Sequence, residues 1–196
     1  MNEKMSDPTE VLRDSIRDVC RTFESLEELA QPIARLADVL TEALAAGRKL
    51  LVCGNGGSAA DGADFTTEFA CRFLNDRRPY PALNLSDGGS LTSAIGNDYG
   101  FAEVFARQVA GFGERGDVLV AITTSGNSKN ILRAIAEGND RGLTTVALLG
   151  RDGGAAKGQA QIELIVPSET TARIQEAHKF LLHVVCQLVD ERLPKK

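Results

Sequence analysis

The sequence predicts an α/β fold, a three-layer sandwich in which helices cover both faces of a five-stranded parallel sheet. First, five short apolar runs alternate with stretches of helical periodicity, as in doubly wound α/β proteins. Second, these runs are apolar throughout rather than at every other position, which indicates strands buried on both faces. Third, the composition, 43% apolar and 25% charged over 196 residues, is ordinary for one globular domain.

A helical arm is predicted ahead of the sheet, over residues 8–47. Apolar residues recur at helical spacing on both sides of Pro32, and Gly47 supplies a stop. Because these helices carry apolar residues on more than one face, we expect part of their surface to pack on another subunit. We therefore divide the chain into an arm, residues 1–47, and a single α/β domain, residues 48–196.

Strands and helices alternate through the predicted domain. The strands are predicted over residues 49–53, 82–85, 118–122, 145–149 and 162–166. The helices are predicted over residues 58–74, 101–112, 128–141 and 171–193. No internal repeat, low-complexity tract or linker interrupts this order, which favours one structural unit.

Charge and composition exclude several classes of protein. The net charge is −5 and Trp is absent, and no basic cluster is interleaved with aromatic residues, so we expect no nucleic-acid partner. No apolar run approaches the ~20 residues that span a bilayer. The first residues are polar and acidic, unlike a signal peptide, and the four cysteines form no CxxC pair. We expect a cytoplasmic protein with no membrane partner.

The first candidate binding loop is Gly-Asn-Gly-Gly-Ser at residues 54–58, between the first strand and a helix. Its glycines let the backbone approach a ligand closely, and the following helix N-terminus presents free N–H groups to an anion. The sequence is neither a dinucleotide-binding GxGxxG nor a Walker motif. Taken alone, it fits an anion site and a tight turn with a helix cap equally well.

The second candidate loop is Thr-Thr-Ser-Gly-Asn-Ser at residues 123–128, also between a strand and a helix. Hydroxyls and backbone N–H groups can share the oxygens of a phosphate without a metal or a lysine. A helix cap explains Asn127 or Ser128, but it does not explain three hydroxyls in a row at a strand end. Since ligands of open α/β sheets bind at the carboxyl ends of strands, this loop favours a phosphate site.

Four segments together resemble the SIS (sugar isomerase) domain family, and within it the phosphoheptose isomerases. They are residues 54–60, 94–101, 116–128 and 173–178, and the resemblance extends over nearly the whole chain. Proteins of this branch convert sedoheptulose 7-phosphate to D-glycero-D-manno-heptose 7-phosphate. The resemblance implies a flavodoxin-like sandwich and a homotetramer whose active sites lie at subunit contacts.

The resemblance also implies roles for particular positions. The phosphate would be held by Ser58, Thr123, Thr124, Ser125 and Ser128. The sugar would be lined by Asn55, Gly56, Gly57, Asn97 and Asp98, with Glu68 and Gln175. Glu68 and His183 would be the acid/base pair. Metal-binding members hold zinc with a histidine at position 64 together with Glu68, Gln175 and His183, whereas this chain has Asp64.

The residues agree with aldose–ketose isomerisation, which moves a proton between adjacent carbons through an enediol. The reaction needs a base for the carbon proton and an acid or metal for the developing oxyanion. Glu68 follows the first loop, and His183 shares a helix face with Gln175 and Lys179. Which of Glu68 and His183 takes the first proton stays open, and we interpret the other histidine, His178, as structural.

The metal is the least determined part of the predicted site. Asp64 and Glu68 are four residues apart on one helix face, so together with Gln175 and His183 they form a set of ligands for a divalent ion. The resemblance implies zinc. The added carboxylate makes this a harder set of ligands, which favours magnesium or manganese more than the usual set does. The alternative is that Asp64 is a solvated helix residue and no metal binds.

The predicted function is therefore a phosphoheptose isomerase that makes heptose for bacterial lipopolysaccharide, capsule or another surface glycan. Two alternatives stay open. One is a non-catalytic SIS scaffold that binds the bacterial replication initiator, whose sequences resemble this chain in the stretch at residues 173–178. The other is a SIS protein that acts on another sugar phosphate, such as a hexosamine phosphate.

Overall fold

The computed structural model, which describes residues 7–195, contains the predicted five-stranded parallel sheet. Its strands, in the order β2-β1-β3-β4-β5, are all parallel to their neighbours. They are β1 (Leu50–Gly54), β2 (Ala82–Asn84), β3 (Val118–Thr123), β4 (Thr144–Gly150) and β5 (Ile162–Val166). β1, β3 and almost all of β4 are buried on both faces, as predicted. The short edge strand β2 is instead partly exposed, because only one neighbour covers it.

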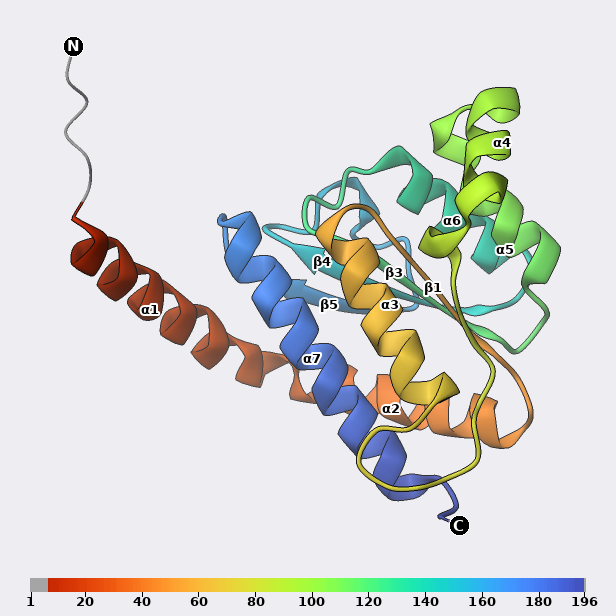
Figure 1. The fold of residues 1–196 in the computed structure, drawn as a ribbon, viewed down its shortest axis with the longest axis horizontal. Helices are drawn as coiled ribbons and strands as arrows, with labels where there is room; N and C mark the ends of the chain where they lie inside the picture. The colour runs from red at the N-terminus through yellow and green to blue at the C-terminus, as the bar shows by residue number, and fades with distance from the viewer. Residues whose placement is uncertain (1–6, 196) are drawn as a thin grey trace.

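Helices cover both faces of the sheet (Figure 1). Alternate residues of one strand enter two separate cores: Leu50 and Val52 pack on one side, Leu51 and Cys53 on the other. The first side is covered by α2 (Ala30–Ala45), α3 (Gly57–Ala70) and α7 (Thr171–Arg192). The second is covered by α4 (Gly89–Tyr99), α5 (Ala106–Phe112) and α6 (Lys129–Asp140). The predicted three-layer α/β fold is confirmed.

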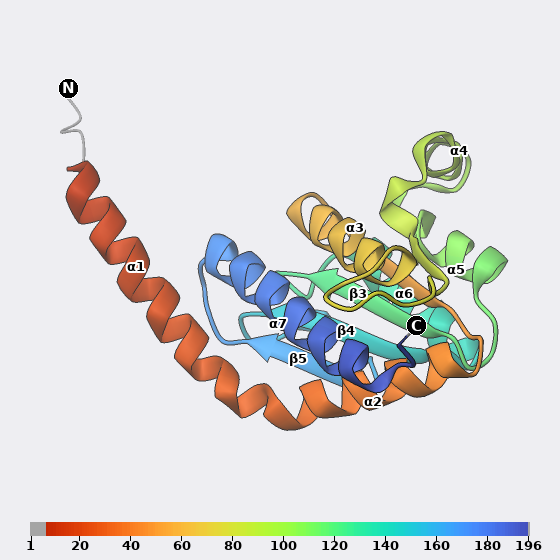
Figure 2. The same cartoon turned by 60° about the horizontal axis from the view of Figure 1, so that its bottom comes forward.

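The arm is a long helix that projects from the sandwich, as Figures 1 and 2 both show. α1 (Pro8–Glu24) begins at Asp7, whose carboxylate accepts a hydrogen bond from the Thr9 N–H at 2.9 Å. A 3₁₀ segment, Ser25–Leu29, joins α1 to α2, and Pro32 lies in the first turn of α2. Residues 1–6 of the predicted arm lie outside the described residues, and the division of the chain at residue 47 stays a prediction.

Two helices differ from their predicted bounds. The helix predicted over residues 101–112 is a 3₁₀ turn, Phe101–Glu103, followed by α5, and α4 before it was not predicted. Four glycines within and beside α4 lower its helix propensity, so the apolar periodicity of the sequence did not reveal this helix. α3 ends at Ala70 rather than at residue 74, because the chain turns there to bring Arg77 under the helix end.

The remaining regular segments are two more 3₁₀ turns, Leu85–Asp87 after β2 and Gly154–Ala156 after β4. Within residues 7–195, no helix combines the length and the apolar character that crossing a bilayer requires.

Candidate functional site

The two predicted loops meet at one edge of the sheet. β1 and β3 are neighbours, so the loops that follow them emerge side by side at the carboxyl ends of the strands. Together they form a small cavity, here called the loop hollow. Its polar lining is Asn55, Ser58, Thr123, Thr124, Ser128 and Gln175. The structure therefore brings residues of both loops together with Gln175, which comes from the last helix.

Contacts from neighbouring elements fix the first loop. The Ser86 hydroxyl donates to the Gly54 carbonyl at 2.9 Å and accepts from the Gly54 N–H at 3.1 Å. Gly57, the first residue of α3, lies so close to Gln175 that a Cβ there would overlap the side-chain amide. Ser86 was not predicted, because it follows the edge strand and carries no sequence signal of its own.

An amide pair joins the two loops. Asn55 and Asn130 exchange two side-chain hydrogen bonds, at 2.8 and 3.0 Å, and Asn130 is buried in the first turn of α6. Asn55 was predicted to line the sugar, and in this structure its amide also holds the loops in register. The sequence analysis missed Asn130, although it lies two residues beyond the second loop.

Thr123, Thr124 and Ser128 of the second loop line the loop hollow, whereas the Ser125 hydroxyl accepts a hydrogen bond from the Asn127 N–H at 3.2 Å. Thr123 and Ser128 lie 3.2 Å apart, oxygen to oxygen, across the loop. Ser128 holds the N-cap position of α6, yet its side chain makes no cap bond, so the cap interpretation does not account for it. In the first turn of α6 the Ile131 N–H donates to the Ser128 carbonyl and to the Asn130 side-chain oxygen, so the N–H groups of Lys129 and Asn130 are the ones that can face an anion.

The Asn127 side chain joins the second loop to the segment that follows β4. Its side-chain N–H donates to the Ser125 carbonyl at 2.9 Å, and its side-chain oxygen accepts from the Ala155 N–H at 3.0 Å. Gly126 adopts φ 65° and packs directly on the Gly153 carbonyl. The loop thus rests on the segment after β4, which orders it before any ligand binds.

α3 and α7 lie side by side and carry the predicted chemistry (Figures 1 and 2). Burial raises the pKa of the Cys186 thiol, and the Glu68 carboxylate raises it further, so the Glu68 carboxylate lies near α7. The His183 ring is exposed and stacks on Phe73, with centroids 6.1 Å apart. Within the described chain, the side chains of Glu68 and His183 form no hydrogen bond with each other.

A charge cluster occupies the same pair of helices, one turn earlier. The Lys179 ammonium pairs with Asp64 and lies 3.2 Å from the Asp61 carboxylate. Burial lowers the pKa of Lys179, but its bonds to Asp64 and Asp61 outweigh that effect and hold this pKa above its ordinary value. Burial raises the pKa of Asp61, which the bond to Lys179 opposes. This pairing was not predicted, although Lys179 was placed on the helix face of Gln175 and His183.

The structure does not assemble the predicted metal ligands into a cation site. Within residues 7–195, no group of three His, Cys, Asp or Glu side chains is arranged to hold a metal ion. Asp64, the ligand on which the prediction depended, is already paired with Lys179. The donor set as it stands therefore does not fit a divalent ion.

Asn97 and Asp98 lie away from the loop hollow. Both are exposed on α4, where the Asn97 amide donates to the Asp98 carboxylate at 2.8 Å. Asp98 instead lines a shallow hollow between α4 and α5, with Tyr99 and Arg107. Within one chain, these two predicted sugar contacts are not brought to the loops.

The structure places the two histidines differently: the His183 ring is exposed, whereas His178 lies in the core. His178 is fully buried, and its Nε2 lies 3.0 Å from the Leu149 carbonyl oxygen. Burial lowers the pKa of His178 to about 4, so its ring is neutral at physiological pH. It is part of the core between α7 and β4 and takes no part in the site.

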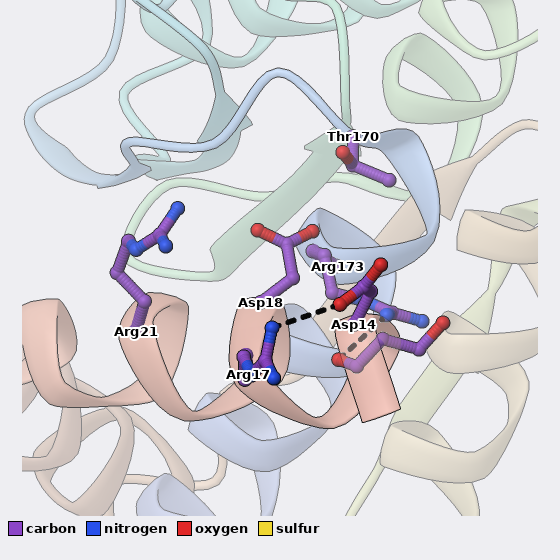
Figure 3. Close-up of a pocket in the computed structure, with 7 residues that line it drawn as sticks. Asp14, Arg17, Asp18, Arg21, Thr170 and Arg173 are labelled. Carbon is purple, nitrogen blue, oxygen red and sulfur yellow. Dashed lines mark hydrogen bonds and ion pairs between the residues drawn. The ribbon is translucent and has the colours of Figure 1, made fainter. Parts of the chain in front are cut away.

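A further hollow separates the arm from the start of α7 (Figure 3). Arg17 pairs with Asp14 at 3.0 Å, and Arg173 donates to the Ser15 carbonyl at 3.2 Å and pairs with Glu176. Both arginines are thus engaged within this chain. The bond from Arg173 to Ser15 joins α7 to the arm across this hollow. The hollow is lined by both acidic and basic side chains, which favours no particular ligand.

Comparison with known proteins places the chain among described families. The model of the SIS domain family matches residues 13–150. A phosphoheptose isomerase of Geobacter sulfurreducens is 50% identical over 174 residues, which cover 88% of this chain and 92% of the relative. One from Coxiella burnetii (strain RSA 331) is 47% identical over 86% of both chains.

Solved structures agree with these sequence matches. The structure of a phosphoheptose isomerase from Neisseria gonorrhoeae superposes with a TM-score of 0.88 at 38% identity, over 94% of this chain and all of that one. A second, from Francisella tularensis, gives 0.85 at 38% identity over 93% and 96% of the two chains.

Proposed function

This chain belongs to the SIS domain family and, within it, to the phosphoheptose isomerases, and we propose that it interconverts sedoheptulose 7-phosphate and D-glycero-D-manno-heptose 7-phosphate. The observation that carries the proposal is the meeting of a glycine-rich loop and a hydroxyl-rich loop with the α3–α7 pair at one edge of the sheet. A phosphate cradle and an acid/base pair on adjoining elements are what an aldose–ketose isomerase needs.

The phosphate is bound by the loop hollow. Hydroxyls and the free N–H groups of α6 surround it, and the helix dipole favours a negative group there. The hydroxyls are those of Ser58, Thr123, Thr124, Ser125 and Ser128. Gln175 lies at the rim of this hollow and orients the sugar, as do Asn55 and the backbone of Gly56 and Gly57.

Glu68 and His183 move the protons. One takes the proton from the carbon next to the carbonyl, and the other supplies a proton to the oxygen of the enediol that forms. The conversion is complete when the neighbouring carbon gains a proton from the base, which exchanges with solvent, and the hydroxyl on the first carbon loses its proton to leave the aldehyde. Both residues lie on the α3–α7 pair, beyond Gln175 along α7, so a sugar anchored by its phosphate extends along these helices.

The active assembly is a homotetramer with its sites at subunit contacts. Leu12 and Ile16 of α1 are more than half exposed, an apolar surface that a second copy would bury. Asn97 and Asp98 lie outside their own loop hollow, which supports a role for them in the site of a neighbouring subunit. We place the protein in the cytoplasm, where its product enters the synthesis of a surface heptose.

The implied zinc ion has no role in this mechanism. Its ligands would be Asp64, Glu68, Gln175 and His183. Because Asp64 is paired with Lys179, these residues do not fit the ion, and the proton transfers rest on Glu68 and His183 alone.

The test is direct. Pure protein is incubated with sedoheptulose 7-phosphate, and the aldose phosphate is followed by NMR with and without added divalent metal. Absence of turnover under both conditions would overturn the proposal. If the same inactive protein also captured the replication initiator, the scaffold alternative would replace it.

Replacing the catalytic carboxylate is the sharpest variant. We expect Glu68→Gln to lower turnover by about 10²- to 10⁴-fold, because general acid–base catalysis contributes about that much. Its affinity for inorganic phosphate, measured by calorimetry, should stay unchanged, since the loop hollow is intact. The matched control is Glu42→Gln, at an exposed position of α2. Full activity of Glu68→Gln would remove Glu68 from the mechanism.

A further inference from the structure

Lys179 places a fixed positive charge between two carboxylates beside the candidate site. Its ammonium lies 3.2 Å from Asp61 and also pairs with Asp64. The Asp61 carboxylate is only 11% exposed, and its second oxygen has no hydrogen-bond partner among the described residues. A nearly buried carboxylate needs a compensating charge, and Lys179 supplies it from the neighbouring helix.

The position of this ammonium follows from the parallel packing of α3 and α7. Gly57 abuts Gln175 at one end of the pair, and Asp64 meets Lys179 further along. Since side chains four residues apart share a helix face, Glu68 lies one turn beyond Asp64, and His183 lies one turn beyond Lys179. The ammonium therefore lies between the phosphate end of the site and its acid/base pair.

Lys179 also faces an open hollow next to the loop hollow. This second hollow, here called the lysine hollow, is lined by Gly57, Ala60, Asp61, Gln175, Glu176 and Lys179. Gln175 lines both cavities, so they adjoin. A sugar phosphate anchored in the loop hollow can extend past Gln175 toward the ammonium.

A divalent ion and this ammonium compete for the same carboxylate. A metal bound through Asp64 would have to displace Lys179 from its partner and would then lie next to a second positive charge. The two carboxylates already have their counter-charge within the chain. Asp61, Asp64 and Lys179 therefore form an ion cluster that needs no metal ion to balance its charge.

We propose that Lys179, held by Asp61 and Asp64, is the built-in cation of this site, and that the isomerase turns over without a divalent metal. The ammonium stabilises negative charge that develops on the sugar oxygens as the enediol forms. The inference rests on the proposed function for its account of turnover, but its account of metal binding stands independently.

The first experiment measures metal and turnover together on the full chain. Protein is stripped with a chelator, titrated with zinc by calorimetry, and assayed with sedoheptulose 7-phosphate before and after each step. We expect no stoichiometric zinc uptake and unchanged turnover after chelation. Uptake of one zinc per chain, with turnover lost on stripping and restored by zinc, would overturn the inference.

Variants of the cluster provide the second experiment. Lys179→Met should lower kcat by about 10²-fold with little change in KM, as when one charge-stabilising donor is removed. Lys179→Arg keeps the charge and should recover part of kcat. Arg192→Met is the control: it lies on α7 like Lys179, breaks only an exposed ion pair with Asp38 of α2, and should keep the wild-type kcat. A folded Lys179→Met protein with the wild-type kcat would contradict the proposal.

A gain of metal binding separates this inference from the proposed function. The double variant Asp64→His with Lys179→Met removes the ammonium and puts an imidazole ligand in place of the Asp64 carboxylate. We expect this variant to bind one zinc per chain. This titration needs no substrate, so it decides the metal part of the inference even for a chain that does not isomerise the heptose phosphate. A folded double variant that takes up no zinc would show that the ion cluster does not control metal binding.

Discussion

Gly126 shows how closely single residues constrain the phosphate loop. Its φ of 65° disfavours other residues, and an added Cβ would overlap the Gly153 carbonyl oxygen. We expect Gly126→Ala to displace the loop, to weaken inorganic phosphate binding measured by calorimetry, and to destabilise the fold by about 1–3 kcal/mol.

Gly47 is the matched control for this substitution. It has a similar φ of 76°, but a Cβ there would meet nothing within 4 Å. Gly47→Ala should therefore cost only the backbone strain, about 1–2 kcal/mol, and should leave phosphate affinity unchanged. Equal phosphate affinities for the two variants would contradict the role assigned to Gly126.

His178 makes the stability of the protein depend on pH. Burial lowers its pKa to about 4, whereas the unfolded chain binds the proton near pH 6.5. Between these values the unfolded state carries more protons, so stability falls as the pH falls through this window. The loss from this residue at about pH 5 is about 2 kcal/mol.

Denaturant unfolding from about pH 8 down to about pH 5 checks this prediction. His178→Gln removes the titrating group, so its stability should fall less over this range than that of the wild type. Parallel pH profiles for the two proteins would show that His178 does not control the acid limit of stability.

At the scale of elements, a buried ion pair ties the end of α3 to α7. The Arg77 Nε donates to Asp190 at 2.9 Å, and the two side chains are 2% and 1% exposed. The Arg77 guanidinium also lies over the rings of Phe69 and Tyr80. This pair keeps the segment after α3 against the helix that carries His183.

Removing one partner leaves the other charge buried. We expect Arg77→Met to lower the free energy of unfolding by about 3–5 kcal/mol, and the double variant Arg77→Met with Asp190→Asn to lose less. The exposed pair Arg192–Asp38 is the comparison, and Arg192→Met should cost at most about 1 kcal/mol. Chemical denaturation measures all three. Similar losses for Arg77→Met and Arg192→Met would contradict the assigned importance of burial.

The sequence predicted the elements that bury continuous apolar runs and missed those that do not. β1, β3 and β4 lie within two residues of their predicted ends because their apolar runs are bounded by polar residues and glycine. α4 was missed because its glycines obscure helical periodicity. The Arg77–Asp190 pair was out of reach, since 113 residues separate its partners and no local pattern links them.

In the candidate site, the two loops were predictable from the sequence, but the contacts between distant elements were not. Both loops follow strands and carry their own chemistry, so their meeting could be expected from a parallel sheet. The pairing of Lys179 with Asp64 depends on the register of α3 against α7, which tertiary packing sets. The same packing put Asn130 against Asn55.

At the scale of the whole molecule, the arm explains the proposed assembly. The end of α1 next to the domain packs on it, since Thr22 is buried and Phe23 lies against Phe180 of α7, whereas Leu12 and Ile16 nearer its start are 62% and 53% exposed. Apolar residues left exposed on one part of a helix are expected to be buried on another copy.

Charges on that surface should therefore break the tetramer. We expect Leu12→Glu with Ile16→Glu to lower the mass measured by light scattering without unfolding the sheet. Glu10→Lys changes charge at an exposed position of the same helix and is the control. If the double variant keeps the wild-type mass, the arm is not the subunit contact.

Solvent exchange during turnover, followed by NMR, tests whether this chain isomerises a heptose phosphate through an enediol. Sedoheptulose 7-phosphate is incubated with the wild-type protein in deuterated water, and the product is examined at carbon 2. The account predicts an aldose phosphate that carries deuterium there, because the enediol regains its proton from a group in exchange with solvent. An unchanged substrate would contradict it, and so would an aldose still free of deuterium after the two isomers have reached equilibrium, because repeated proton transfers through an exchangeable base would have labelled it by then.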